Sequence, residues 1–293
     1  DATAETRGTL PLSLKMVRTV SAAATDLLLD TYTGAAAAYS VRKLDKDYTG
    51  NCMRVRRDSD NAESDIGFDG SGGVDQSAIA THCGSANGYV VTFYDQSGNS
   101  NNLTQNAGGN QPKIYDQTTA AVLTVNGKPA LSFDGSNDQF TIDNTGLDIG
   151  NLSVFIVTKH DTTNQNSIML SMSGGTSPTN KRWYVGYQAL GDFNFGYAGV
   201  SKAVSTTATT DQQLSTMIAG TTQGNMSAFI DGSLIGTATR DTGISSNQQA
   251  ALGTFNNQFY ASVKVQEFIY WSADQSSNRT GIESDINTYF SIY

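Results

Sequence analysis

Short apolar runs that alternate with polar residues recur along this chain, and turn-forming pairs separate them. Alternation with a period of two puts every second side chain on one face, which is the pattern of a strand with one solvated side. An Asn-Gly or Asp-Gly pair between such runs is a strong hairpin signal. Such pairs, with one Gly-Gly, occur at 126–127, 134–135, 174–175 and 231–232. Strands at these short intervals predict a β sandwich or barrel and not βαβ units.

The predicted strands cover most of the chain after residue 52. They span 53–56, 64–68, 88–94, 121–125, 129–133, 139–142, 152–158, 167–172, 182–188, 192–198, 214–219, 225–230, 233–238, 248–253 and 261–271.

Two stretches predict helix instead. Asp26 is placed to cap a turn at 27–29, and the alanines of 35–40 favour helix after Gly34. Residues 274–289 predict a late helix, capped by Ser276 or Ser277. Its core-facing positions at helical spacing are Ile282, Ile286 and Tyr289.

No repeat or linker divides the chain, so residues 26–293 are predicted to form one domain. Residues 1–25 predict an amino-terminal arm or added strand. Such an arm either closes its own sheet or packs on a neighbouring subunit.

The surface is polar but weakly charged. Charged residues make up 15% of the 293 residues, the net charge is −9 and the pI is about 4.6. Nucleic-acid binding needs a dense basic footprint, and the cluster of Arg54, Arg56 and Arg57 lies among acidic residues that we expect to pair with it. No apolar run approaches the ~20 residues of a membrane span. This composition is typical of extracellular and virion-surface β proteins, the location that we predict.

The chain has two cysteines and two histidines, which give no zinc-ligand spacing. Cys52 and Cys83 fit either one disulfide or two buried thiols. His82 and His160 lie near no nucleophile-elbow motif, which argues against Ser-His-Asp catalysis.

Residues 94–105 read YDQSGNSNNLTQ directly after a predicted strand. The side chains of Asp95, Gln96, Asn99 and Asn101 suit sugar hydroxyls, but they equally suit an Asx-type turn that satisfies its own backbone. Both readings stay open. Calcium is a possible cofactor in the same region, since Asp95, Asp134, Asn137 and Asp138 offer oxygen ligands, although without EF-hand spacing.

Aromatic residues cluster in the second half of the chain. Alternation places Phe193, Phe195 and Tyr197 on one strand face, which is either the sandwich core or a platform for sugar rings. Trp183 and Tyr184 must point to opposite faces of their strand. We therefore predict that Trp183, Tyr184 and Asp192 contribute to carbohydrate binding.

Two resemblances follow from longer segments. The hairpin FIDG at 229–232 and the strand VQEFIY at 265–270 resemble the closing part of concanavalin A-like, laminin-G-like jelly rolls. The segments AAYSVRKLDKDYTGNCMRVRRDSDNAESDIGF, GYVVTFYDQSGNSNNLTQ and PALSFDGSND resemble a module of phage and bacterial surface proteins. They also resemble the catalytic domain of fungal-type α-L-arabinofuranosidases. These resemblances imply a concanavalin A-like jelly-roll β sandwich with short peripheral helices.

The arabinofuranosidase resemblance implies a nucleophilic Glu on a mid-chain strand and an acid/base Asp after a glycine-rich segment. Residues 151–220 contain no Glu, and Asn256 or Asn257 stands at the later position. We therefore predict no catalytic residues and a non-catalytic surface or virion module, of the capsid-decoration, fibre or adhesin type. Its partners would be glycans and further copies of the chain bound through the arm. The alternatives are an arabinofuranosidase-like hydrolase and a purely structural virion or filament subunit.

Overall fold

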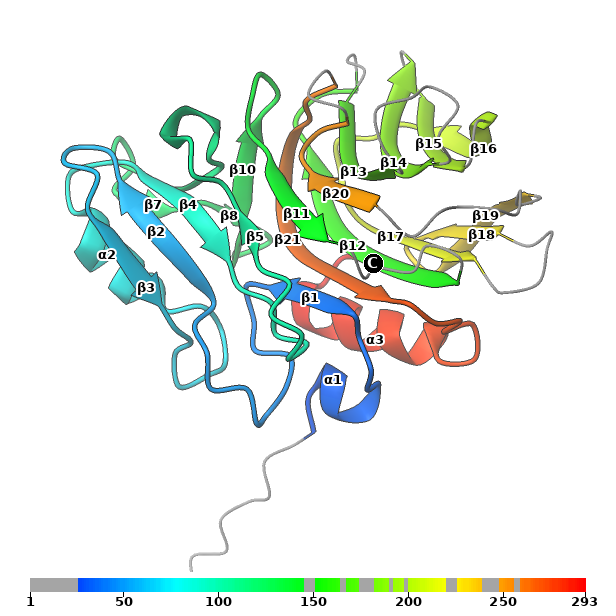
Figure 1. Cartoon of the computed structure of the whole chain (residues 1–293), viewed down its shortest axis with the longest axis horizontal. Coiled ribbons are helices and arrows are strands. Elements are labelled where there is room, and N and C mark those ends of the chain that lie inside the picture. The colour runs from blue at the N-terminus through cyan, green and yellow to red at the C-terminus, as the bar shows by residue number, and fades with distance from the viewer. Residues whose placement is uncertain are drawn as a thin grey trace, which may run out of the picture.

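The computed structural model describes residues 26–144, 151–163, 167–173, 182–189, 192–197, 200–219, 226–238, 248–255 and 259–293. Over these ranges the protein is an all-β sandwich of antiparallel strands with short helices at its periphery, as the alternating pattern predicts (Figure 1). The helices are α1 (Leu28–Thr31), α2 (Gln76–Cys83), η1 (Gly108–Asn110, a 3-10 turn) and α3 (Arg279–Phe290). The predicted arm, residues 1–25, lies outside the described residues.

The first layer is a long, twisted sheet built around β21. Its strands pair in the order β3–β2–β4–β6–β10–β21–β12–β17–β18–β19, and β1 pairs with β21 beyond the end of β10. Their bounds are β1 (Ala37–Ser40), β2 (Met53–Arg57), β3 (Glu63–Ile66), β4 (Gly88–Phe93), β6 (Lys113–Asp116), β10 (Leu131–Asp134), β12 (Leu152–His160), β17 (Gln212–Ala219), β18 (Met226–Ile230), β19 (Ser233–Ala238) and β21 (Ser262–Trp271).

The second layer pairs in the order β11–β20–β13–β14–β15–β16. The two layers are joined through β5 (Leu103–Thr104), which pairs with both β4 and β11. The bounds of the second-layer strands are β11 (Phe140–Asn144), β13 (Ser167–Ser173), β14 (Arg182–Ala189), β15 (Asp192–Tyr197), β16 (Val200–Thr207) and β20 (Gln248–Leu252). Two short additions complete the strands. β7 (Ala121–Val122) pairs with β6, and β8 (Thr124–Val125) forms a hairpin with β9 (Lys128–Pro129).

Local turn chemistry sets two hairpins as predicted. Asn126 and Gly127 connect β8 to β9 with φ of 47° and 71°, and Asp231 and Gly232 connect β18 to β19 with φ of 51° and 75°. Both pairs of positive φ values belong to the turn type that matches strand twist. The pair at 134–135 instead ends β10 and leads the chain to β11 in the other layer, and the pair at 174–175 lies outside the described residues.

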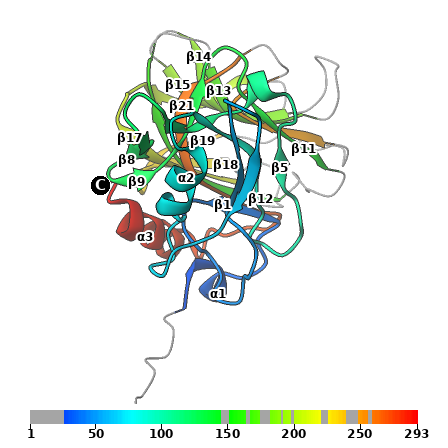
Figure 2. The ribbon, with the colours of Figure 1, turned by 90° about the vertical axis from the view of Figure 1, so that its left-hand side faces the viewer.

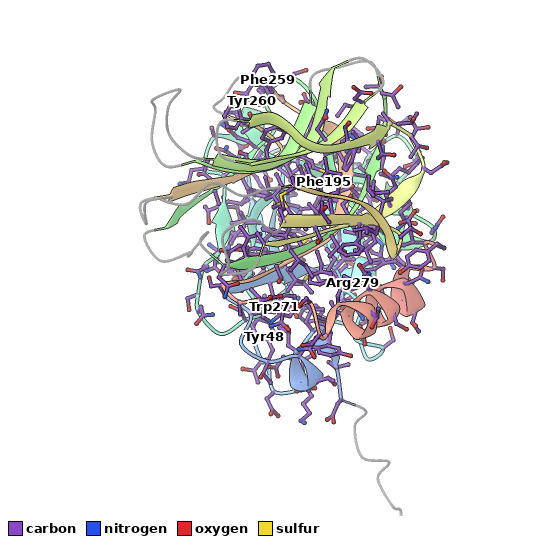
Figure 3. The ribbon with its side chains drawn as sticks, turned by 90° about the vertical axis from the view of Figure 1, so that its right-hand side faces the viewer. Tyr48, Phe195, Phe259, Tyr260, Trp271 and Arg279 are labelled. Atoms are coloured by element: carbon purple, nitrogen blue, oxygen red, sulfur yellow. The ribbon has the colours of Figure 1, made fainter. Side chains whose placement is uncertain are left out.

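Aromatic side chains fill the space between the layers. Tyr39 stacks on Phe268 at 5.5 Å between ring centroids and lies 5.9 Å from Phe93. Phe193 and Phe195 are 1% and 0% exposed, and Phe195 lies between the layers in Figure 3. This strand face is therefore sandwich core and not a sugar platform.

The predicted helix at 35–40 is wrong. Ala37–Ser40 forms β1, which pairs with Glu267–Tyr270 of β21 and is fully buried. Helix propensity of alanine is a weak preference that tertiary pairing overrides, and here small side chains suit a strand that is covered on both faces. The predicted Asp26 cap is also wrong, because the Asp30 carboxylate accepts the Leu27 N–H at 2.7 Å.

The late helix is confirmed over Arg279–Phe290, with Asn278 and not a serine at its start. Ile282, Ile286 and Phe290 are buried, and Tyr289 is half-buried. The helix packs on the outer face of the first layer, beside β21 and β1 (Figure 1).

The two cysteines are free, buried thiols, so the predicted disulfide is not formed and the alternative of two buried thiols is the one observed. The Cys52 thiol donates to the Ser40 carbonyl at 3.2 Å. Burial raises the pKa of the Cys83 thiol to about 11, which keeps it protonated and unreactive.

A bulge in β21 divides the outer face of the first layer. The register with β12 shifts between Val157 and Thr158, opposite Gln266. The Gln266 amide donates to the carbonyls of Val125, Lys128 and Pro129 and so holds the β8–β9 hairpin over the sheet. This hairpin lies beside the end of α3 (Figure 2), where Asn126 donates to the Ser291 carbonyl at 3.2 Å. The helix covers one half of the face, and the other half presents polar side chains.

Candidate active site

The loop after β4 is held against the free edge of β1 by Asp95. Its carboxylate accepts the backbone N–H of Ala38 at 2.8 Å, of Ser97 at 2.9 Å and of Asn101 at 2.9 Å, and the Ser97 hydroxyl at 2.7 Å. Asp95 is only 4% exposed. The carboxylate therefore builds this turn and satisfies an edge strand that would otherwise leave backbone groups unpaired.

The amides of the same loop continue this role. Gln96 accepts the Leu44 N–H at 2.8 Å and donates to the carbonyls of Ser40 and Arg42. Asn99 donates to the Ala35 carbonyl at 2.9 Å, and Asn101 to the Ala36 carbonyl at 2.8 Å. All these contacts connect the loop to residues 35–44, as the turn reading expects, while a role of the four side chains in sugar binding stays a prediction.

The other predicted sugar-binding residues lie apart from this loop. Tyr184 on β14 is 2% exposed and packs against Phe255, so its ring is closed to a sugar, contrary to the prediction. The side chain of Trp183 lies outside the described residues. Asp192 begins β15 in the second layer and is half-buried.

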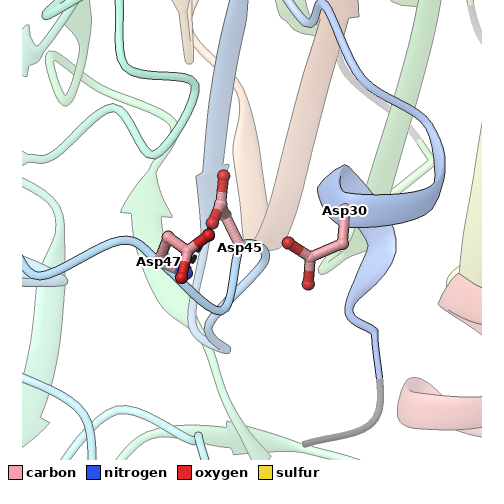
Figure 4. A group of neighbouring side chains, drawn as sticks. All are labelled: Asp30, Asp45 and Asp47. Atoms are coloured by element: carbon pink, nitrogen blue, oxygen red, sulfur yellow. Dashed lines mark hydrogen bonds between the residues drawn. The ribbon is translucent and has the colours of Figure 1, made fainter.

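The four proposed calcium ligands are split by the fold. Asp134, Asn137 and Asp138 share one turn after β10, whereas Asp95 faces β1. A different group of carboxylates lies within metal-ligand distance in the described part of the chain, namely Asp30, Asp45 and Asp47 (Figure 4). Asp30 accepts the backbone N–H of Leu27, and Asp45 that of Asp47 at 2.7 Å. One carboxylate oxygen of Asp30 and one of Asp45 are thus used by the local backbone, and calcium stays a prediction.

The uncovered half of the outer face is hollowed into a cleft of about 870 Å³. Cross-strand pairing brings its lining together, because Tyr89, Lys113, Ser132 and Lys264 are successive neighbours on β4, β6, β10 and β21. Arg56 is paired with Tyr89 from β2. The remaining lining residues are Asp58, Asn61, Gly108, Gly109, Gln111, Asp116, Leu123, Asp134 and Asp138.

Two carboxylates with different surroundings meet in this cleft. Asp138 is 7% exposed and its Oδ2 accepts the Asp134 backbone N–H at 2.9 Å. Burial first, and then the negative charge of Asp134, raise the pKa of Asp138 to about 7. Asp134 is exposed, and its carboxylate accepts the N–H groups of Ser136 at 2.8 Å and Asn137 at 3.3 Å.

The opposite wall of the cleft is basic and aromatic. The Tyr89 ring has the Arg56 guanidinium 5.2 Å from its centroid and the Lys113 ammonium at 5.9 Å. Arg56 donates to Gln111 Oε1 at 2.7 Å and to Asn61 Oδ1 at 2.9 Å, while Lys113 pairs with Asp116 at 3.3 Å. The arginines near Arg56 in the sequence pair with acidic residues as expected. Arg54 pairs with Asp65 and Arg57 with Asp60, each at 2.8 Å.

This arrangement combines groups that hydroxyl-rich ligands require. Amides, hydroxyls and charges of both signs bind sugar hydroxyls, and a half-buried ring offers an apolar face. A buried Asp whose pKa is raised to about 7, beside a second and exposed Asp, is the kind of carboxylate pair from which acid and base roles are assigned in glycosidases. Asp134 and Asp138 were predicted from sequence as ligands, whereas Tyr89, Lys113 and Lys264 were not predicted, since cross-strand neighbours have no local signal.

The histidines do not join the cleft. His160 is 2% exposed and its ring lies 6.0 Å from that of Phe193. Burial lowers the pKa of His160 to about 3, so the ring stays neutral in the core. Within the described ranges, no helix has both the length and the apolar character needed to cross a membrane.

Comparison with known proteins identifies the family. The family model described as "Alpha-L-arabinofuranosidase B, catalytic" matches residues 25–182. Alpha-L-arabinofuranosidase B of Aspergillus oryzae is 38% identical over 120 residues, covering 38% of this chain and 24% of that protein. The enzyme of Emericella nidulans is 36% identical over 130 residues, covering 41% of this chain and 26% of that protein. The chain thus spans about a quarter of the length of these relatives.

Solved structures share the fold. An arabinofuranosidase complexed with arabinofuranosyl-alpha-1,2-xylobiose has a TM-score of 0.66 at 19% identity, over 86% of this chain and 62% of that one. A mutant α-L-arabinofuranosidase soaked with 4-nitrophenyl α-L-arabinofuranoside has a TM-score of 0.68 at 18% identity, over 88% and 64%.

The family match corrects the functional prediction. A model of a catalytic domain covers more than half of the chain, and no comparison reported above involves a capsid, fibre or adhesin. The prediction of a non-catalytic virion or surface module is therefore wrong, as is the prediction that the chain is not an enzyme. The resemblance to a phage module is not supported. The chain belongs to the family of the α-L-arabinofuranosidase B catalytic domain.

Proposed function

We propose that this chain is a glycoside hydrolase unit that cleaves α-L-arabinofuranosyl linkages in a glycan. The observation that carries the proposal is the match of the catalytic-domain family over residues 25–182. The relatives are named as α-L-arabinofuranosidases, and a solved neighbour was crystallised with an arabinofuranosyl xylobiose.

The chemistry needs an acid that protonates the glycosidic oxygen and a carboxylate that stabilises the positive charge on the sugar ring. We assign the acid to Asp138, because a pKa of about 7 keeps a large fraction of its carboxyl protonated at neutral pH. Asp134 lines the same cleft as the second carboxylate. Water then completes the cleavage, so that one molecule of water is consumed for each arabinose released.

The glutamates of the described chain offer no better acid. Glu267 is 0% exposed and forms a buried ion pair with Arg42, and Glu283 pairs with Arg279. Glu63 lies on β3 beside Arg54. Asp192 is the competing candidate, because it lies on a mid-chain strand where the family resemblance implies a catalytic carboxylate.

Hydrolysis of a panel of 4-nitrophenyl glycosides tests the function. We expect the wild-type protein to release 4-nitrophenol from the α-L-arabinofuranoside and little from the pyranosides. On an arabinofuranosyl xylobiose, whose sugar leaving group needs a proton, activity should be lost in Asp138→Asn and retained in Asp192→Asn. Activity lost only in Asp192→Asn would place the essential carboxylate on β15 and leave the function intact. No turnover of any arabinofuranoside by the wild-type protein would refute the function.

The proposed function also replaces the predicted partners. The partner is an arabinofuranosyl glycan, bound as substrate. It replaces the predicted binding of further copies of the chain through residues 1–25, because the names and ligands of the relatives do not suggest such an assembly. Polysaccharides that carry such substituents lie outside cells, so the extracellular location predicted from the surface composition fits this function, and the virion location is set aside.

A further inference from the structure

The turn that carries Asp138 runs from the end of β10 to the start of β11, where the two layers of the sandwich are joined. β5, the strand that joins them, ends at Thr104, which is paired with Thr141 of β11. Gln105 follows directly, and its N–H donates to the Val91 carbonyl of β4 at 2.8 Å. The fold therefore fixes the backbone of Gln105 close to the acidic turn.

The side chain of Gln105 and the loop that follows it hold both backbone groups of Gln139, the residue after Asp138. Gln105 Nε2 donates to the Gln139 carbonyl at 3.1 Å. The Gln139 N–H donates to the Asn110 carbonyl at 3.0 Å. Gln105 is itself oriented, because its Oε1 accepts the Ala107 N–H at 2.9 Å. The acidic turn is thus tied to the loop that follows β5.

The same set of contacts extends to the basic wall of the cleft. Gln111, which is 2% exposed, donates to the Gln105 carbonyl at 2.7 Å and accepts a hydrogen bond from Arg56 Nε at 2.7 Å. Arg56 also donates to the Gly108 carbonyl at 2.9 Å. Hydrogen-bonded networks rigidify the segments that they connect. Arg56, Gln111 and Gln105 therefore link β2 to the acidic turn through one continuous line of hydrogen-bonded residues.

The second layer supports the turn at Asp138 itself. Gly253 follows β20 with a φ of +90°, and a Cβ at this position would lie 2.9 Å from the Asp138 carbonyl oxygen and 2.5 Å from the Phe133 ring. The backbone of the two layers is therefore in close contact here. The Asp138 side chain is 7% exposed, so its orientation follows from the backbone that Gly253 and Gln105 hold in place.

Resting on the proposed function, we propose that Gln105 is a positioning residue for the acid, which fixes the turn so that the Asp138 carboxyl is directed at the glycosidic oxygen of the substrate. Among the described residues Gln105 does not line the cleft, so it acts through Asp138. An acid donates its proton only from within hydrogen-bond distance, and a displacement of about 1 Å in a catalytic group can cost ~100-fold in rate.

Comparison of two substrates separates the positioning of the acid from a general loss of structure. Arabinofuranosyl xylobiose has a sugar leaving group that needs a proton, whereas 4-nitrophenolate leaves without one. Gln105→Ala is expected to lower kcat about tenfold on the xylobiose and less than about twofold on 4-nitrophenyl α-L-arabinofuranoside, with KM unchanged on both. Gln76→Ala is the matched control and should leave both rates unchanged, since this exposed glutamine begins α2 outside the cleft lining.

Amide hydrogen exchange followed by mass spectrometry tests the contact without any turnover. In Gln105→Ala the peptide that contains residues 134–141 should exchange at least about fivefold faster, while the peptide of β12 keeps its wild-type rate. Gln105→Met keeps the length of the side chain and removes its polar groups. It should give the same two results, and it replaces Gln105→Ala if that variant folds poorly.

Equal losses of kcat on the two substrates would overturn the positioning role of Gln105, as would wild-type exchange of residues 134–141 in both variants. Either result leaves the hydrolase function intact. Cleavage of neither substrate by the wild-type protein would refute the function and the catalytic role of Gln105 with it, even where faster exchange shows that Gln105 holds the turn.

Discussion

Asp138→Asn is expected to stabilise the fold above pH 7 while it removes activity. The folded pKa of Asp138 is raised to about 7 from an ordinary value near 4. Binding of this proton therefore contributes fully to the free energy of unfolding below pH ~4, and the contribution is lost as the pH rises through 7. An amide carries no charge and still accepts the Asp134 N–H, so we expect a gain of roughly 1–3 kcal/mol in the free energy of unfolding at pH 8.

The same substitution should lower kcat at least ~100-fold on a substrate with a sugar leaving group, because an amide cannot donate the proton. Urea denaturation at pH 5 and pH 8, with rates on the same samples, measures both effects. Asp69→Asn is the control: its hydrogen bonds to Ser71 lower the pKa of Asp69, so this exposed site should show no gain at pH 8. A loss of stability at pH 8 in Asp138→Asn would contradict the electrostatic account.

Glu267→Gln is expected to cost about 3–5 kcal/mol of folding free energy, the usual cost of breaking a buried ion pair. Both Glu267 oxygens accept hydrogen bonds from Arg42, at 2.8 and 3.1 Å, and Oε2 also accepts the Ser40 hydroxyl at 2.6 Å. Arg42 also pairs with Asp285 of α3 at 2.8 Å and lies 5.0 Å from the Tyr289 ring centroid. One carboxylate thus joins β21, β1 and the terminal helix.

The loss in Glu267→Gln is measured by urea denaturation at pH 7 against Glu63→Gln. Glu63 is half exposed and lies 3.9 Å from Arg54, so its replacement should change the free energy of unfolding by less than ~0.5 kcal/mol. A loss below about 1 kcal/mol in Glu267→Gln would show that α3 is held by its apolar face alone, through Ile282, Ile286 and Phe290.

Strands and hairpins could be predicted because their signals are local. Apolar-rich runs mark β12 and β17, a short alternating run marks the start of β21, and the pairs at 126–127 and 231–232 supply the positive φ values that their turns need. β1 could not be found in this way, since its alanines favour helix and only its pairing with β21 decides otherwise. β6 and β16 were missed for a similar reason: they are defined by their partners β4, β10 and β15.

The candidate site was predictable only in its acidic turn. Asp134 and Asp138 lie four residues apart, and the sequence suggested their oxygens as calcium ligands only. The basic and aromatic wall comes from β2, β4 and β6, and Lys264 of β21, which also lines the cleft, lies 175 residues after Tyr89 in the sequence. The amides of the loop at 94–105 suggested a ligand site, yet these side chains bind the backbone of Ala35, Ala36 and Leu44, on either side of β1. The resemblance identified the family correctly, while the missing mid-chain Glu led to the wrong conclusion about catalysis.

The pH dependence of kcat/KM on arabinofuranosyl-α-1,2-xylobiose tests the central claim most directly. Because the free protein must hold a proton on Asp138, the account predicts that kcat/KM falls tenfold per pH unit above a pKa of about 7. The residual activity of Asp138→Asn should lack this fall. A wild-type kcat/KM that stays constant from pH 6 to 9, or the same fall of kcat/KM above pH 7 in Asp138→Asn, would contradict the assignment of the acid. The absence of any arabinose release would contradict the function itself.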